Sequence, residues 1–260
     1  MKRLTLFSLF LTCALFAGCH TKSRSISHPG YPQQVSYCGD GARERASDPD
    51  FEYRGELSEF DVLGIPHGEF TSEEDIQRAL AASKPVRLRA GSSILLIQSG
   101  ALFPDGPMVA ELSKHFRVVP FSGVPTVRRI GSGALQTESP DPESYSKSLR
   151  LTAARGGTDF ILCYWGRLES ETDRLPTKTV SWVPLVNWIM PDERQHMRIQ
   201  LKVALVDVRS GNWSVFSPKS FDNARISTSP RRGAADQKQV ERLKKLAYEA
   251  SVAELVQGYN

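Results

Sequence analysis

Few residues in this chain have the types and the spacing that catalysis requires. Ser144 and Lys147 stand three positions apart, as in the S-x-x-K motif of enzymes that form an acyl-serine intermediate. The chain has no Lys-Thr-Gly to accompany the motif. Because both residues fall within an expected helix, this is also the spacing of neighbouring side chains on a solvated helix face. We therefore expect surface residues here and not a nucleophile.

Metal-ligating and acidic side chains are also poorly placed for chemistry. His67, Glu69 and His196 stand apart, whereas a zinc site needs three or four convergent ligands. The carboxylates grouped at residues 169–173 fall in an expected charged loop, where acidic side chains are ordinarily solvated. We expect no catalytic residue, no metal site and no cofactor. The alternative interpretation is a secreted hydrolase such as a peptidase.

The first residues of the chain have the pattern of an export signal. Lys2 and Arg3 precede a mostly apolar run at residues 4–16. A run of this length is too short to cross a bilayer core of about 30 Å as a helix. A short basic region followed by a short apolar region is typical of a signal that is removed on export.

Cys19 is the residue with the clearest chemical assignment. It follows Ala17 and Gly18, and the three residues resemble a bacterial lipobox, although Phe16 stands where leucine is usual. The resemblance implies that signal peptidase II removes residues 1–18 and that the Cys19 thiol carries diacylglycerol, in a lipid anchor with acyl chains such as palmitate. The alternative is an ordinary secretory signal with a chance cysteine.

The anchor also predicts a location. If the lipoprotein sorting rule applies, His20 rather than aspartate at the second mature position indicates the outer membrane, with the domain facing the periplasm. The bilayer, bound through acylated Cys19, is then the first expected partner.

Composition narrows the remaining classes. The chain of 260 residues is 40% hydrophobic and 24% charged, which is typical of a folded protein. Its formal charge is only +4, and two of the positive charges, Lys2 and Arg3, leave with the signal, so a nucleic-acid partner has no electrostatic support. After the signal, no segment reaches 18 consecutive apolar residues, and we expect no transmembrane helix.

Two cysteines remain after export and acylation, Cys38 and Cys163. They form a disulfide only if their Cα atoms approach within about 7 Å. Cys38 lies in a polar segment and Cys163 in the middle of an apolar run. We keep the disulfide as a candidate and favour a buried, unreactive Cys163.

The mature chain divides into a tether and one domain. Residues 19–57 are rich in Ser, Arg, Gly, Pro and Asp without apolar periodicity, which predicts a flexible tether. Residues 58–260 alternate short apolar strands with amphipathic helices. The expected helices cover residues 72–83, 107–116, 142–155 and much of 234–258; the expected strands cover 93–97, 117–121, 159–168, 197–208 and 213–216.

This order predicts an α/β fold: a single three-layer-like domain with a mixed sheet, βαβαβ followed by antiparallel hairpin strands and a C-terminal helix. Residues 122–140 are expected to be a loop and 169–176 a charged loop. The predicted sheet core is Ile94, Leu96, Phe160, Leu162, Leu201, Val203 and Leu205.

Two motifs resemble a group of bacterial envelope domains. Residues 154–162 are similar to an A-R-x-x-G-A-D-x-x-[VIL] step, one residue shorter before the Asp, and residues 203–211 to an L-x-L-V-D-x-x-T-G hairpin. The group contains the N-terminal domain of the Tol–Pal translocation protein, the curli-secretion lipoprotein and lipoprotein activators of penicillin-binding proteins. The resemblance covers about residues 93–217. It implies a non-catalytic envelope module that binds another envelope protein or a glycan.

An apolar run at residues 180–190 departs from that group. Pro184 argues against a central strand, and the run lacks the alternation of a one-sided strand. Folding onto the core is one interpretation. The other is an apolar edge that binds a partner or lipid, because Trp and Met are enriched at interfaces. The candidate partner-binding residues are Trp182, Trp188, Ile189 and Met190.

Overall fold

The fold is built on a mixed sheet. The computed structural model describes residues 22–27, 55–65, 72–125, 128–130, 134–136, 142–174, 193–227 and 232–258. Within these residues, seven strands form one sheet, and β4 (Arg128–Ile130) and β5 (Ala134–Gln136) form a separate hairpin. The strands of the main sheet are β1 (Lys22–Ser25), β2 (Ser93–Gln98), β3 (Arg117–Phe121), β6 (Phe160–Arg174), β7 (Glu193–Asp207), β8 (Trp213–Phe216) and β9 (Phe221–Ser227).

Strands β3, β2 and β6 are parallel neighbours in that order, and all further pairings are antiparallel. All six residues of β2 are buried, which explains the continuous apolar run in its sequence. Strand β7 instead alternates, because one of its faces carries the larger core.

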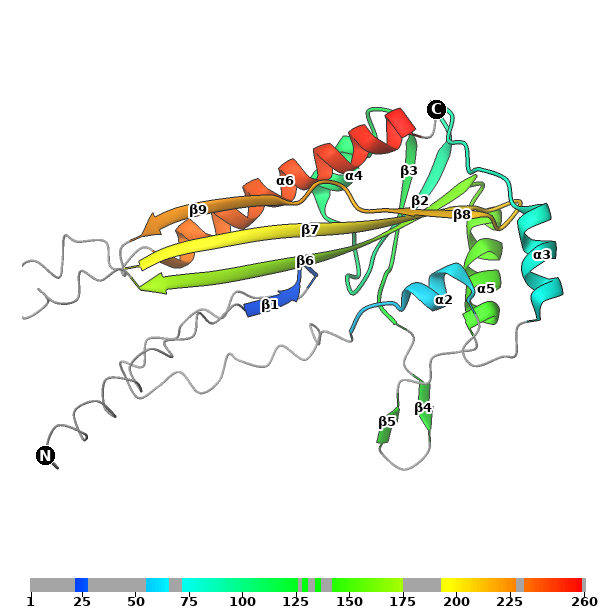
Figure 1. Ribbon diagram of the computed structural model, residues 1–260, viewed down its shortest axis with the longest axis horizontal. Helices are drawn as coiled ribbons and strands as arrows, with labels where there is room; N and C mark the ends of the chain where they lie inside the picture. The colour runs from blue at the N-terminus through cyan, green and yellow to red at the C-terminus, as the bar shows by residue number, and fades with distance from the viewer. Residues whose placement is uncertain are drawn as a thin grey trace, which may run out of the picture.

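Helices cover both faces of the sheet (Figure 1). From β2 the chain crosses to β3 through α4 (Gly106–Leu112), and later it crosses back over β2 to β6 through α5 (Pro142–Arg155). Because the two right-handed crossovers run in opposite directions across the sheet, these helices lie on opposite faces. The long α6 (Arg232–Gly258) joins α4 over the larger core, and the short α2 (Glu59–Leu63) joins α5 over the smaller one. This arrangement confirms the predicted mixed α/β architecture. All seven predicted core residues lie in the larger cluster.

A long arm extends from this layered body. Strands β6 and β7 pair over fifteen residues each, from Phe160 opposite Asp207 to Arg174 opposite Glu193, a length of about 50 Å. Strand β9 extends the arm beside β7, strand β1 pairs with β6, and α6 lies along one face (Figure 1). The residues between Arg174 and Glu193 therefore begin and end at the far end of the arm.

Several local expectations were wrong. Residues 169–174 continue strand β6 and are not a loop, because the backbone pairs with β7 whatever the polarity of the side chains. The loop expected at 122–140 contains the hairpin of β4 and β5, and the polar stretch 218–233 contains β9. The expected tether includes a strand, since residues 22–25 form β1 in the main sheet.

Helix α3 (Glu73–Ala82) lies within the helix expected at residues 72–83, and a capping box holds its first turn. The Ser72 hydroxyl accepts from the Asp75 amide, and the Asp75 carboxylate accepts from the Ser72 amide. The hydroxyl of Ser72 also holds the pKa of Asp75 below its usual value. The apolar residues of this helix nevertheless stay exposed, Ile76 at 44% and Leu80 at 64%, so its sequence predicted the helix but not its packing.

We predict that Leu201→Ala lowers the free energy of unfolding by about 2–5 kcal/mol, because Leu201 is 5% exposed in the larger core. Leu80→Ala on α3 is the matched control and should change it by less than about 0.5 kcal/mol. Urea denaturation of both variants makes the measurement. Equal effects at the two positions would show that the register of β7 is wrong.

Candidate functional site

The structure places the sequence candidates for catalysis on an ordinary surface. Ser144 and Lys147 are exposed on α5, and the Lys147 ammonium lies 2.5 Å from the Glu143 carboxylate one turn earlier. An exposed ammonium paired with a carboxylate of its own helix is typical of a surface lysine. Among the described residues, no three His, Cys, Asp or Glu side chains are grouped so that they could hold a metal ion.

Cys163 is a free, fully buried thiol in the smaller core. Burial, and secondarily the charges of Glu56 and Glu59, raise its pKa well above the ordinary value, so it stays protonated and unreactive. Cys38, the other half of the candidate disulfide, lies outside the described residues, as do Cys19 and the partner-binding candidates Trp182, Trp188, Ile189 and Met190.

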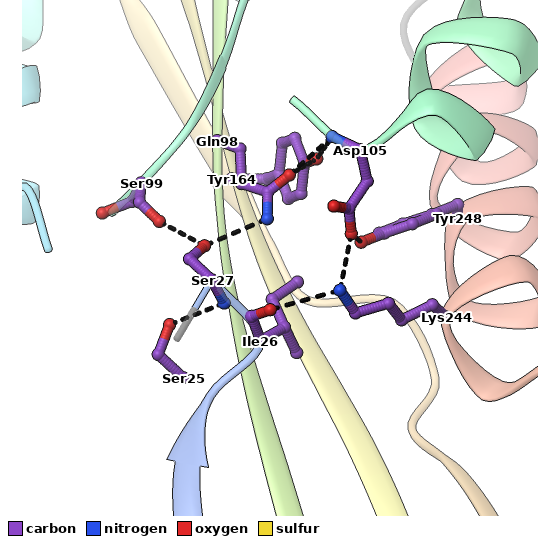
Figure 2. Close-up of polar contacts among 9 residues, drawn as sticks. All are labelled: Ser25, Ile26, Ser27, Gln98, Ser99, Asp105, Tyr164, Lys244 and Tyr248. Atoms are coloured by element: carbon purple, nitrogen blue, oxygen red, sulfur yellow. Dashed lines mark hydrogen bonds and ion pairs between the residues drawn. The ribbon is translucent and has the colours of Figure 1, made fainter. Parts of the chain in front are cut away.

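The densest polar cluster lies where β2 ends (Figure 2). The side-chain oxygen of Gln98, Oε1, accepts from the Tyr164 hydroxyl at 2.6 Å and from the Asp105 backbone amide at 2.7 Å. The Gln98 side-chain amide donates to the Ser27 hydroxyl at 3.0 Å, and that hydroxyl donates to the Ser99 carbonyl at 2.6 Å. Gln98 therefore joins the central strand, the entry to α4 and the N-terminal segment.

An ion pair extends the cluster to α6. The Lys244 ammonium lies 2.7 Å from the Asp105 carboxylate and donates to the Ile26 carbonyl at 3.2 Å. The Tyr248 hydroxyl donates to the same carboxylate, and its ring meets the Tyr164 ring edge-on with centroids 5.8 Å apart. Burial is the main cause that raises the pKa values of both tyrosines well above normal. Both stay protonated at neutral pH and serve as hydrogen-bond donors.

Two segments of the N-terminal region meet at Ser99. Its carbonyl accepts from Ser27, and its hydroxyl accepts from the Leu57 amide at 2.8 Å. The Leu57 carbonyl in turn accepts from the Trp165 indole at 2.8 Å. Residues 22–27 and 55–57 are thus fastened to one point on the sheet, although 27 residues separate Ser27 from Gly55.

Ile26 packs into the larger core directly over Gly166 of β6. A Cβ atom at position 166 would lie 2.2 Å from the Ile26 Cδ1 atom, so only glycine lets the two segments approach this closely. The Ile26 amide donates to the Gly166 carbonyl at 2.9 Å. An isolated glycine inside a strand is the one signal in the sequence that could have indicated this contact.

The cluster is suited to holding the chain together. In open α/β sheets, ligands bind in the crevice beyond the carboxyl ends of the parallel strands. Here the chain itself occupies that place beyond β2, through Ser27 and Leu57. The Asp105 carboxylate is paired with Lys244 and Tyr248, and both tyrosines are protonated. These groups act as a clamp on the N-terminal segment.

A second feature lies at the opposite end of β2. A hollow of about 820 Å³ lies near the start of β2 and β6 and the end of β7, lined by three arginines and two aspartates, Arg87, Arg89, Arg209, Asp159 and Asp207. The Asp159 carboxylate accepts from the Ser93 amide at 3.0 Å, and that of Asp207 from the Ser210 amide at 2.7 Å. The Asp159 carboxylate joins the starts of β2 and β6, and the Asp207 carboxylate fixes a local turn. The exposed guanidinium groups give the hollow a slightly basic surface.

These features define an α/β domain whose N-terminal segment is part of its own sheet. No helix in the described part of the chain is long and apolar enough to cross a membrane. Residues 58–258 match the model of the YafT bacterial lipoprotein family, and the chain belongs to that family. It is therefore a lipoprotein of the bacterial envelope.

No curated protein matches the chain. Among solved structures, the chain is similar to the lipoprotein GNA1162 from Neisseria meningitidis, at 14% identity and a TM-score of 0.24. The match covers 60% of this chain and 98% of the other.

We predict that Lys244→Met lowers the free energy of unfolding by about 1–3 kcal/mol, because it removes a partner from the partly buried Asp105 carboxylate. Lys245→Met is the control on the same helix. The Lys245 side chain is 70% exposed and its ammonium lies 3.9 Å from the Glu249 carboxylate, so the substitution should change stability by less than about 0.5 kcal/mol. Urea titrations compare the two. Indistinguishable midpoints would mean that the clamp contributes nothing.

Proposed function

We propose that this lipoprotein is anchored in the outer membrane by acylated Cys19, faces the periplasm, and acts as a non-catalytic binding or assembly module. Its partner on this proposal is another envelope protein or a glycan. The family membership supports the lipid anchor in the envelope, and the lipobox resemblance supports Cys19 as its site.

The observation that carries the non-catalytic role is the use of the crevice beyond β2. The chain fills it with Ser27 and Leu57 and pairs Asp105 with Lys244. The side chains there that are of the types used in acid–base chemistry are instead paired with one another and stabilise the fold. Binding then falls to exposed surfaces.

We place the binding surface in the apolar run at the far end of the arm. Strands β6 and β7 end at Arg174 and Glu193, beyond Leu168 and Met197, the outermost core residues of these two strands. The run contains Trp182, Trp188, Ile189 and Met190, side-chain types that are enriched at protein interfaces. Its sequence together with this placement supports a partner-binding role.

We predict that Cys19→Ser abolishes membrane anchoring, because several acyl chains are needed for stable attachment and serine accepts none. Fractionation of cells should find the variant uncleaved or in the soluble fraction. Cys38→Ser is the control and should remain in the membrane fraction. Unchanged partition and gel mobility of the Cys19 variant would contradict the anchor site.

We predict that replacing Trp188 and Ile189 together with Ser abolishes partner capture and leaves the melting temperature nearly unchanged. The measurement is cross-linking and pull-down from solubilised envelope with the mature lipoprotein. Replacing the exposed Ile76 and Leu80 of α3 with Ser is the matched control and should retain capture. A large fall in melting temperature for the Trp188 and Ile189 variant would instead place these side chains in the core.

A further inference from the structure

The fastened N-terminal segment begins very close to the anchor. Only His20 and Thr21 separate Cys19 from Lys22, the first residue of β1. Three successive Cα–Cα steps of about 3.8 Å limit the distance between the Cα atoms of Cys19 and Lys22 to about 11 Å, whatever path the chain takes. The acylated residue is therefore held near the arm.

Residues 22–27 are attached to the domain by backbone pairing, by one buried side chain and by polar contacts. Strand β1 pairs antiparallel with residues 167–170 of β6, and Ile26 is buried over Gly166. Polar contacts in the C-terminal half of the segment add to these: Ser25 to Glu56 at 2.6 Å, Gln98 to Ser27 at 3.0 Å and Lys244 to the Ile26 carbonyl at 3.2 Å.

The residues expected to form the tether therefore do not let the domain move farther from the anchor. Residues 28–54 connect Ser27 to Gly55 in the sequence, and Ser27 and Leu57 are both bonded to Ser99. A chain that starts and ends at one point adds no distance between the anchor and the domain.

We propose that the β1 edge of the arm, formed by β1 and residues 167–171 of β6, lies against the phospholipid headgroups of the bilayer that holds Cys19. The proposal deepens the proposed function, on whose Cys19 anchor it rests. The occupant follows from the length of chain between the anchor and β1, which is too short to let this edge leave the membrane surface.

The chemistry of this edge suits headgroups. Within the described residues β1 pairs only with β6, so its outer backbone groups face outward. Lys22 and Ser23 are exposed there, and an ammonium and a hydroxyl are suitable donors to phosphate oxygens. The domain then lies on the membrane instead of standing away from it.

Fluorescence quenching in vesicles tests this arrangement. The acylated full-length protein, with Cys38→Ser to remove a competing thiol, is reconstituted into phosphatidylethanolamine–phosphatidylglycerol vesicles that contain spin-labelled headgroups. A fluorophore is placed at Glu171→Cys beside the β1 edge, or at Ala82→Cys on α3, at the end of the molecule away from the arm (Figure 1). We expect quenching several-fold stronger at position 171 than at position 82.

The second part of the test uses variants that release β1 from the domain. Gly166→Val displaces Ile26, and Ile26→Ser removes the same contact from the other side, should the first variant fail to fold. Release of β1 frees residues 20–54 as a tether with a mean reach of about 30–35 Å. Quenching at position 171 should then fall to the level at position 82, with circular dichroism confirming the fold.

The outcomes separate the two proposals. Flotation of the vesicles measures the anchor alone. Loss of the wild-type protein from the floated fraction overturns the proposed anchor and the membrane pose with it. Two results would overturn the contact of the β1 edge with the headgroups while leaving the anchor intact. One is normal flotation with equal quenching at positions 171 and 82. The other is normal flotation with quenching at position 171 that does not change in the folded Gly166→Val or Ile26→Ser variant.

Discussion

The pairing of β6 with β7 is the interaction on which the other elements depend. At its inner end it joins the parallel strands to the antiparallel part of the sheet, since β6 is the parallel neighbour of β2 and the antiparallel neighbour of β7. Along its length it supports β8 and β9 on one side and β1 on the other. Helix α6 packs along the same ladder. A register shift by one residue would turn the apolar face of β7 away from α6 and expose the larger core.

This ladder also explains how the N-terminal segment and the C-terminal helix come into contact. Strand β6 presents Gly166 to Ile26, and two residues earlier it presents Tyr164 to Gln98 and to Tyr248 of α6. Lys244 completes the contact, because its ammonium bonds both the Ile26 carbonyl and the Asp105 carboxylate. Residues 22–27 and helix α6 thus stabilise each other through one strand, so the attachment of β1 is coupled to the packing of α6.

The sequence predicted the elements whose signals are local. The apolar run of β2, the alternation of β7 and the capping box of α3 each follow from residues within one element. The seven core residues were found because apolar side chains on known faces of strands must be covered. The clamp was not predicted, because tertiary structure brings together Ser27, the stretch that contains Gln98 and Asp105, and Tyr248 from three distant parts of the chain.

Two strand segments that the sequence missed share one property: their backbones are paired while most of their side chains are polar. Residues 22–27 resemble a tether in sequence because Ile26 is the one apolar residue among them, yet one buried side chain and a paired backbone are sufficient once Gly166 leaves room. The outer part of β6 reads as a loop because its residues are charged. There Arg167 lies 3.3 Å from Glu169, and Glu169 stands opposite Arg198 across the ladder, so opposite charges accompany the pairing on a face without a core. The polarity of the side chains in a strand indicates which face of the sheet is covered. Whether the segment forms a strand depends instead on whether a neighbouring backbone is available for hydrogen bonding. In this protein the arm supplies that backbone, and segments that are polar in sequence become ordered parts of its sheet.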